Sequence, residues 1–155
     1  IKKNNLICVA PDVGGTARAR ALGKMLNIDL AIIDKRRPKP GKSEVMNVIG
    51  KVNNKTCIIV DDIIDSGGTI VNAAKALKNN GAKDVHVYCS HGVLSGNAVE
   101  KIKNSKVKNL VITDTIDNVS KVKKAKNIEI LTISHLVGEA IKRISNSTSV
   151  SDLFN

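Results

Sequence analysis

Six short runs of aliphatic residues recur along the chain, and segments with helical patterning separate them. The runs are rich in Val and Ile and nearly continuous in hydrophobicity, which is typical of strands covered on both faces of a sheet. They are Asn5–Ala10, Asp29–Asp34, Thr56–Asp61, Asp84–Cys89, Asn109–Thr113 and Ile128–Ile133. This alternation predicts an α/β domain with a mainly parallel sheet flanked by helices.

Four segments carry apolar residues at the spacing of a helix face. They are Thr16–Leu26, Thr69–Asn80, about Asn97–Ile102 and Ser134–Ile144. The segment from Thr69 ends before Gly81, where a helix C-terminal glycine is expected. In the segment from Ser134, that serine is a candidate N-cap. The apolar face of this last helix consists of Leu136, Val137, Ala140, Ile141 and Ile144.

Composition limits the partners that this chain can have. The 155 residues fit a single domain, 1–155. Lys and Arg number 25 against 14 Asp and Glu, and the resulting charge of +11 is compatible with polyanionic ligands. A solvated lysine-rich surface explains the same surplus, because the lysines are scattered. With no Trp, one Tyr and one Phe, few rings could stack on bases, which disfavours nucleic acid as a partner.

The cysteines and the hydropathy pattern indicate the cellular compartment of the protein. Cys8, Cys57 and Cys89 each lie in an apolar run, without metal-ligand spacing, and their odd number disfavours a disulfide framework. We therefore expect buried thiols in a reducing compartment. No apolar run approaches the length of a membrane span, and no signal peptide is visible. These observations predict a cytoplasmic protein without membrane partners.

Ligands of an open parallel sheet bind outside the carboxyl ends of its strands. Five loops are therefore candidate sites: Pro11–Gly15, Lys35–Ser43, Asp62–Gly68, Ser90–Gly96 and Asp114–Asn118. We expect mobile loops at Lys35–Ser43 and Asn118–Lys126. His91 ends a predicted strand, and a lone histidine there is more often a surface or packing residue than a catalytic group.

The stretch VDDIIDSGGT, residues 60–69, combines three carboxylates with two glycines and two hydroxyls. Gly67 and Gly68 let backbone N–H groups approach an anion at the start of the next helix, where Ser66 and Thr69 add hydroxyl donors. Asp61 and Asp62 could accept hydrogen bonds from sugar hydroxyls or hold Mg²⁺. The loop therefore predicts a phosphosugar site, with the phosphate on Asp65–Thr69. A capped strand-to-helix turn would explain Asp65 and Ser66, but not two consecutive acids at a strand end.

Two other loops have anion-binding character. DKRRPKPGK, residues 34–42, holds five cations and two prolines after a predicted strand. It could close over a polyphosphate, and a basic surface loop or a nucleic-acid contact fits the residues equally well. PDVGG, residues 11–15, opens a helix, where Gly14 and Gly15 suit a pyrophosphate and Asp12 could carry a metal. An ordinary turn has the same composition.

Together these motifs resemble the ribose-phosphate pyrophosphokinase family, whose members are also called phosphoribosyl-pyrophosphate synthetases. VDDIIDSGGT looks like the phosphoribosyl-pyrophosphate loop of type I phosphoribosyltransferase folds. The resemblance covers nearly the whole chain and extends to the segments PDVGGTARARALGKML, LAIIDKRRPKP, VMNVIG, SHGVLSGNAVEKI, LVITDTI and AIKRISNSTSVSDLF. Family members are about twice as long and have two similar domains in tandem. The resemblance therefore implies that this chain is the second domain.

The resemblance implies a reaction and a set of roles. The family transfers the diphosphate of ATP to the 1-hydroxyl of ribose 5-phosphate with Mg²⁺ and releases AMP. Lys35 and Arg37 correspond to cations that stabilise the transferring phosphoryl group, and Arg37 is also expected to bind ribose 5-phosphate. Asp12 corresponds to a Mg²⁺ ligand in the pyrophosphate loop with Gly14 and Gly15. The ribose 5-phosphate site corresponds to Asp61, Asp62, Asp65, Ser66, Gly67, Gly68 and Thr69.

The family also implies regulation and assembly. Ser149, Ser151 and Phe154 correspond to a C-terminal segment that lines an allosteric site for phosphate or ADP, with phosphate as an activator. The usual assembly is a homohexamer or a related ring, and most adenine contacts lie in the first domain. Two rival functions remain: a non-catalytic regulatory subunit of the synthetase, and a nucleic-acid-binding regulator on a phosphoribosyltransferase fold.

Overall fold

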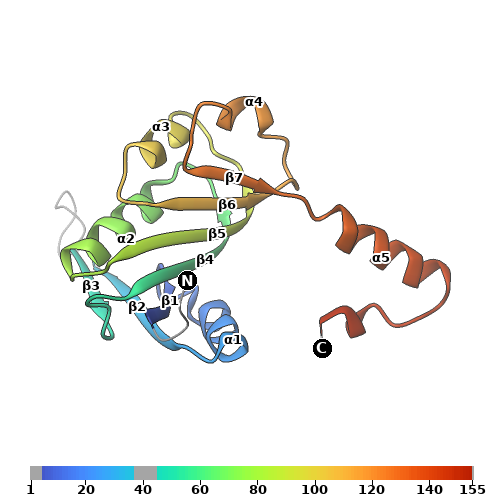
Figure 1. The fold of residues 1–155 in the computed structure, drawn as a ribbon, viewed down its shortest axis with the longest axis horizontal. Helices are drawn as coiled ribbons and strands as arrows, with labels where there is room; N and C mark the ends of the chain where they lie inside the picture. Colours follow the sequence, from blue (N-terminus) through green and yellow to red (C-terminus); the bar gives the residue numbers. More distant parts are fainter. Residues whose placement is uncertain (1–4, 37–44, 155) are drawn as a thin grey trace.

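The computed structural model describes residues 5–36 and 45–154 of the chain. In this part, seven strands form one sheet in the order β3-β2-β1-β4-β5-β6-β7 (Figure 1). Neighbouring strands pair in parallel except β2 and β3, which are antiparallel. The predicted mainly parallel sheet is confirmed. The strands are β1 Leu6–Ala10, β2 Asp29–Arg36, β3 Val45–Ile49, β4 Thr56–Ile64, β5 Asp84–Gly92, β6 Asn109–Thr113 and β7 Ile128–Leu131.

Helices lie on both faces of the sheet. Helix α1 packs on one face against β1, β2 and β4, whereas α2 and α3 cover the other face (Figure 1). The four predicted helices are present, with starts and ends within two residues of the predicted ones. In chain order the helices are α1 Thr16–Leu26, α2 Gly68–Asn79, α3 Ala98–Lys103, α4 Val119–Val122 and α5 Ser134–Ser145, followed by a 3₁₀ helix at Ser151–Phe154.

Two apolar clusters hold these layers together. The larger one joins β4, β5 and β6 to α2 and α3, and it includes the fully buried side chains of Ile59, Val87 and Leu110. The smaller one lies beneath α1 and is built around Cys8, Ala10 and Ala19. Because both faces of the central strands are covered, their sequences are almost continuously apolar, as the runs predicted.

Gly81 ends α2 as the sequence predicted. It has a φ of +83°, and its N–H donates to the carbonyl of Lys78, while the N–H of Ala82 donates to the carbonyl of Leu77. This pair of bonds is a Schellman motif, which needs a residue in the left-handed region at the position that Gly81 occupies.

Several predicted boundaries were wrong. Strand β4 continues to Ile64 and β5 to Gly92, because Ile63 and Ile64 still pair with His91 and Gly92. Strand β3 was not predicted, and it pairs with a β2 that runs on to Arg36 instead of ending at Asp34.

Two predictions near the C-terminal part of the sheet were also wrong. The expected loop 118–126 contains helix α4, and the Asn118 side chain is buried and donates to the Gly92 carbonyl. Ser134 is the first helical residue of α5, whose N-cap is Ile133. The backbone N–H of Ser134 donates instead to the hydroxyl of Thr132.

Helix α5 projects away from the body of the domain (Figure 1). Its apolar residues share one face as predicted, but none of its residues is buried, and Ile141 and Ile144 are 61% and 67% exposed. The apolar period of α5 is therefore real, yet no described part of this chain covers it. No helix in residues 5–36 or 45–154 is long and apolar enough to cross a membrane.

The three cysteines are buried and unpaired by disulfides, as predicted. Burial raises the pKa of Cys57 and of Cys89 to about 11, so both thiols stay protonated and unreactive at neutral pH. We expect a thiol reagent such as dithionitrobenzoate to label the native chain only slowly, and to label three thiols per chain promptly in denaturant. Rapid labelling of even one thiol in the native chain would contradict this packing.

Candidate functional site

The candidate site lies where the order of the strands reverses. Strand β1 is followed by β2 on one side, and β4 pairs with β1 on the other, so the loops after β1 and β4 leave the sheet side by side in opposite directions. Ligands of open α/β sheets bind at such switch points. A cleft of about 330 Å³ opens there, within the size range of small-molecule sites. It is lined by Asp12, Asp61, Asp62, Ile63, Ile64, Asp65, Ser66, Gly67, Gly68, Thr69 and Ile70.

The glycine pair shapes the floor of this cleft. Gly67 has a φ of +74° and is the N-cap of α2, and no side chain caps the first turn of that helix. A Cβ at Gly67 would lie 3.2 Å from Cδ1 of Ile102, so the turn also packs closely on α3. The uncapped N–H groups and the positive end of the helix dipole therefore face a cleft that can receive an anion.

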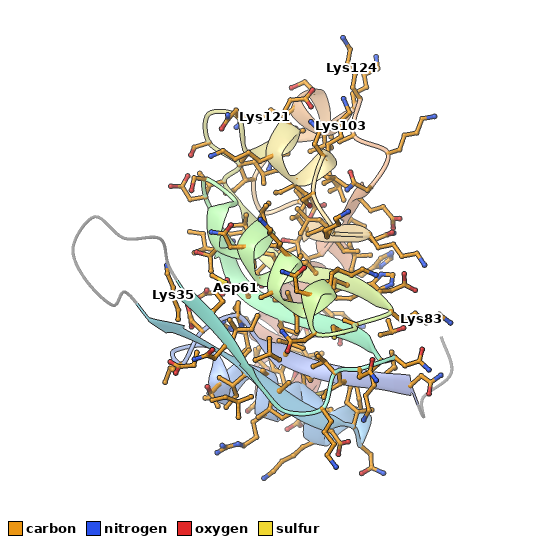
Figure 2. The ribbon with its side chains drawn as sticks, turned by 90° about the vertical axis from the view of Figure 1, so that its left-hand side faces the viewer. Lys35, Asp61, Lys83, Lys103, Lys121 and Lys124 are labelled. Atoms are coloured by element: carbon orange, nitrogen blue, oxygen red, sulfur yellow. The ribbon has the colours of Figure 1, made fainter. Side chains whose placement is uncertain are left out.

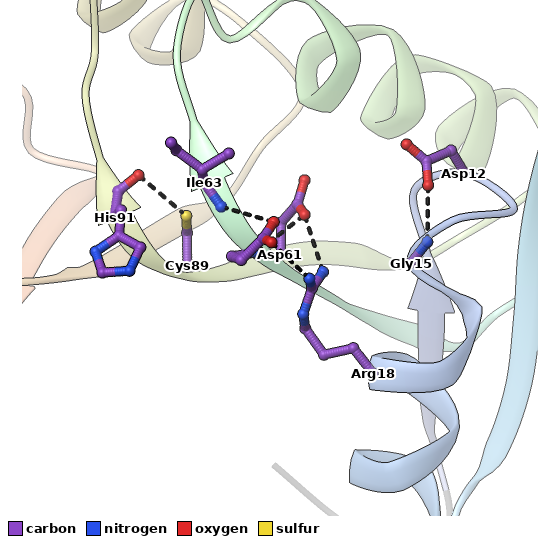
Figure 3. A network of polar contacts seen from close by, with 8 residues as sticks. Asp12, Gly15, Arg18, Asp61, Ile63, Cys89 and His91 are labelled. Carbon is purple, nitrogen blue, oxygen red and sulfur yellow. Dashed lines mark hydrogen bonds and ion pairs between the residues drawn. The ribbon is translucent and has the colours of Figure 1, made fainter.

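Two consecutive acids lie at the end of β4, beside that turn. Asp61 Oδ1 accepts the backbone N–H of Asp62 at 3.0 Å, and Asp62 Oδ1 accepts the N–H of Ile63 at 3.0 Å. The guanidinium of Arg18, from α1, reaches both carboxylates (Figure 3). The predicted sugar-binding acids and the predicted phosphate loop thus border one cleft.

The two acids differ in their surroundings. Asp61 is the more buried, with 19% of its side chain exposed against 61% for Asp62. Burial raises the pKa of Asp61, and the neighbouring Asp62 raises it further, while Arg18 opposes the shift. Hydrogen bonding to Asp61 lowers the pKa of Asp62. Asp61 is therefore the acid that takes up a proton first as the pH falls, and at neutral pH it is a desolvated acceptor ready for a hydroxyl donor.

The loop after β1 closes the opposite side of the cleft. Asp12 Oδ1 accepts the backbone N–H of Gly15 at 2.8 Å (Figure 3), which fixes the turn into α1. A Cβ on Gly14 would lie 3.3 Å from that same oxygen, so a side chain there would require Asp12 to shift by a few tenths of an ångström. One role of Asp12 is thus the structural one of an ordinary turn, and its carboxylate still borders the cleft.

The donors at this cleft suit a Mg²⁺ ion that is bound together with phosphate, and not one that is held in a cage of side chains alone. No three side chains of Asp, Glu, His or Cys in the described part of the chain stand close enough together to form a ready metal cage. Mg²⁺ beside phosphates is usually held by one or two carboxylates, with waters and phosphate oxygens completing its shell. Asp12, Asp61 and Asp62 supply the hard oxygen donors that this second mode needs.

Lys35 lies at the same edge of the sheet but does not line the cleft. It is a half-buried residue of β2, and Figure 2 shows it on the side of the molecule where Asp61 lies. Since β1 separates β2 from β4, the two strands are about 10 Å apart, or two strand spacings. That distance suits an extended polyphosphate better than a sugar. Arg37 lies outside the described residues.

The predicted allosteric residues lie in the segment that follows α5. The hydroxyls of Ser149 and Ser151 are 3.1 Å apart, and Ser149 also donates to Asp152 at 3.0 Å. Phe154 is 69% exposed. This segment lies beyond the projecting helix α5, away from strand β4 and helix α2 (Figure 1). The structure therefore does not join these residues to the cleft.

Lys101, from α3, donates from Nζ to the carbonyl of Ser66 in the cleft at 3.5 Å, whereas other described lysines lie elsewhere on the molecule. Figure 2 shows Lys83 on the side of the molecule opposite Lys35, and Lys103, Lys121 and Lys124 together near α3 and α4. His91 contacts Thr115, with Nδ1 2.9 Å from the hydroxyl oxygen. Arg18 is the site residue that sequence reasoning left unassigned. Its position in the first turn of the helix that starts at the switch point was the available signal.

Comparisons with known proteins agree with this geometry. Residues 36–155 match the family described as "Phosphoribosyl synthetase-associated domain". Ribose-phosphate pyrophosphokinase of Hyphomonas neptunium is 58% identical over 154 residues, which are 99% of this chain and 49% of that protein. The chain thus spans about half the length of the curated relatives that it matches.

Similarity to solved structures identifies the fold of the chain. The crystal structure of phosphoribosylpyrophosphate synthetase from Mycobacterium smegmatis has a TM-score of 0.83 at 33% identity, covering 92% of this chain and 46% of that one. Purine phosphoribosyltransferase from Pyrococcus horikoshii shares the fold alone, with a TM-score of 0.51 at 22% identity over 84% of this chain and 76% of that one. The fold is therefore the phosphoribosyltransferase type, and the chain belongs to the phosphoribosyl synthetase-associated domain family, with ribose-phosphate pyrophosphokinases among its relatives.

Proposed function

We propose that this chain is the ribose 5-phosphate-binding part of a ribose-phosphate diphosphokinase, an ATP-dependent enzyme that forms 5-phosphoribosyl 1-diphosphate and AMP. The observation that carries the proposal is the single cleft that joins an uncapped glycine turn to two consecutive carboxylates. The turn suits the 5-phosphate, and Asp61 and Asp62 suit the hydroxyls of the pentose. Relatives named for this activity, at about twice the length, support it.

In the proposed reaction, the 1-hydroxyl oxygen of the sugar attacks the β-phosphorus of ATP. A new bond forms between that oxygen and the β-phosphorus, the bond from the β-phosphorus to the bridging oxygen breaks, and AMP leaves with the bridging oxygen while the hydroxyl proton passes to solvent. Positioning and charge neutralisation supply most of the catalysis in phosphoryl transfer. The 61–69 segment would fix the sugar for in-line attack.

The charges around the phosphates come from three sources in this proposal. Lys35 and Arg37 would neutralise the oxygens of the transferring group. When bound, Mg²⁺ supplies further positive charge, and Asp12, with Asp62 beside it, would hold it. Most contacts to adenine would come from residues outside this chain. Assembly as a homohexamer or a related ring, a cytoplasmic location, and activation by phosphate at Ser149, Ser151 and Phe154 are parts of the same proposal.

Titration of the 155-residue chain with ribose 5-phosphate in a calorimeter tests the binding site. We expect ribose 5-phosphate to bind more tightly than either ribose or inorganic phosphate, because the cleft engages both ends of the molecule. Equal affinity for inorganic phosphate and ribose 5-phosphate would contradict a sugar site at the acids. AMP formation from ATP by the natural polypeptide that carries this chain tests the reaction.

Replacing Asp61 with Asn should weaken ribose 5-phosphate binding roughly tenfold to a hundredfold, because a hydrogen bond to a charged acceptor is worth about 1.5–3 kcal/mol. The free energy of unfolding should not fall, because burial already penalises the charged form of Asp61. Asp29→Asn is the matched control, since Asp29 is 77% exposed and pairs with Lys55 away from the cleft. Unchanged affinity in Asp61→Asn would remove Asp61 from the sugar site.

A further inference from the structure

One arginine connects the two loops of the cleft. Arg18 lies in the first turn of α1, the helix that begins after Asp12–Gly15. Its Nη1 donates to Oδ1 of Asp61 at 3.1 Å, and its Nη2 contacts Oδ2 of Asp62 at 2.8 Å (Figure 3). These contacts span 43 residues of sequence, and they tie the helix of one loop to the strand that carries the acids.

Arg18 is one of several groups that hold the two carboxylates, beside the backbone N–H groups of Asp62 and Ile63. Successive side chains on a strand point to opposite faces, and both Asp61 and Asp62 belong to β4. The fork of a guanidinium offers two donors in fixed geometry, which lets one group hold two oxygens at a set separation. Arg18 is therefore the side chain that contacts both acids at once, and it can hold them at a set separation.

The same contacts decide which acceptor atoms remain for a ligand. Oδ1 of Asp61 accepts from both Arg18 and the N–H of Asp62. In Asp62, Oδ1 accepts from Ile63 and Oδ2 contacts Arg18. Arg18 and the two backbone N–H groups thus restrict which carboxylate oxygens can accept a hydrogen bond from a sugar hydroxyl.

Charge gives Arg18 a second effect. Four carboxylates, those of Asp12, Asp61, Asp62 and Asp65, line a cleft that the glycine turn equips for an anion. Arg18 offsets one of these negative charges at contact distance. Because Arg18 is 37% exposed and Asp61 19%, solvent screens this interaction only in part. Without it, the paired acids would repel both each other and an incoming phosphate.

We propose that Arg18 is a positioning residue of the sugar site: it aligns the carboxylates of Asp61 and Asp62 for the pentose hydroxyls and lowers the negative charge that meets the 5-phosphate. This inference rests on the proposed function of the cleft. It predicts that loss of Arg18 weakens binding of ribose 5-phosphate without removing a group from the phosphoryl-transfer step.

Calorimetry with ribose 5-phosphate on the 155-residue chain tests the inference. Arg18→Ala should weaken binding about tenfold or more. A misaligned carboxylate would lose one charge-assisted hydrogen bond to a sugar hydroxyl, which corresponds to a loss of that size. Arg18→Lys should recover part of the loss, because an ammonium keeps the charge but not the two-pronged geometry. Arg20→Ala is the matched control, since Arg20 is an exposed residue of the same helix and lies outside the cleft.

Kinetics on the natural polypeptide separate positioning from a merely structural role. Arg18→Ala should raise KM for ribose 5-phosphate about tenfold while kcat stays within a few-fold, as expected when binding alone is lost. Equal affinity in Arg18→Ala and the unaltered chain, or a fall of kcat with KM unchanged, would overturn the inference while leaving the proposed function intact. An unaltered chain that fails to bind ribose 5-phosphate would instead overturn the proposed function, and the role of Arg18 with it.

Discussion

Replacing Lys35 with Ala in the natural polypeptide should lower kcat for 5-phosphoribosyl 1-diphosphate formation about 10²–10³-fold, the usual cost of removing one transition-state donor. Affinity for ribose 5-phosphate should stay within a few-fold. The reason is geometric: Lys35 is on β2, two strand spacings from the acids of β4, and does not line the cleft. In the proposed function it would therefore meet the phosphates of ATP and not the sugar. Steady-state kinetics with both substrates measure the two effects.

Lys83→Ala is the control for Lys35→Ala, because Lys83 is an exposed lysine on the far side of the molecule (Figure 2). It should leave both kcat and KM unchanged. A kcat of Lys35→Ala within a few-fold of the unaltered value would contradict the assigned role. An equally large loss of affinity for ribose 5-phosphate would contradict it as well. An unaltered polypeptide that binds ribose 5-phosphate but forms no AMP would point to the rival function of a regulatory subunit.

The central strands of the sheet could be predicted because both of their faces are covered. Six of the strands appeared in the sequence as aliphatic runs, since only a strand covered on both faces needs apolar residues at every position. Strand β3 was not predicted, because its five residues, VMNVI, are interrupted by the polar Asn47, which is exposed.

The limits of β4 show why strand ends are hard to predict. The sequence predicts that the strand ends at Asp61 and that the loop begins at Asp62, because charged residues seldom continue a buried strand. The backbone nevertheless stays extended to Ile64, where it pairs with Gly92 of β5. Main-chain hydrogen bonds do not depend on residue type. They therefore continue the strand beyond the position where its side chains change from apolar to charged.

Most of the cleft could be predicted from one continuous motif, because residues 61–69 are neighbours in the sequence and line it together. Asp12 joined them through the rule that parallel strands bring their carboxyl ends to one edge. The contact of Arg18 with the acids could not be predicted, since it depends on the side-chain direction of a residue 43 positions away. The exposure of the apolar face of α5 could not be predicted either, because amphipathic spacing predicts an apolar face but not what covers it.

Replacing Gly67 with Val should cause the largest loss of ribose 5-phosphate affinity, about 10²–10⁴-fold. A φ of +74° is unfavourable for any side chain by roughly 1–2 kcal/mol, more so for a branched one, and a Cβ there would meet Ile102 at 3.2 Å. The turn must then move, and the amides of residues 67–69 lose their common direction. Loss of two bonds to phosphate, at about 1.5–3 kcal/mol each, gives the stated range. Calorimetry with ribose 5-phosphate measures it.

Gly96→Val separates the loss of the site from the strain of the backbone. Gly96 also has a positive φ, +56°, but nothing lies within 4 Å of a Cβ built there, and it does not line the cleft. Both variants should unfold at lower denaturant concentration, because both place a branched residue in the left-handed region. Only Gly67→Val should lose affinity for the phosphosugar, and the milder Gly67→Ala should lie between. If Gly67→Val bound ribose 5-phosphate as tightly as Gly96→Val, the glycine turn would not be the phosphate site, and the two acids beside it would have to hold some other ligand.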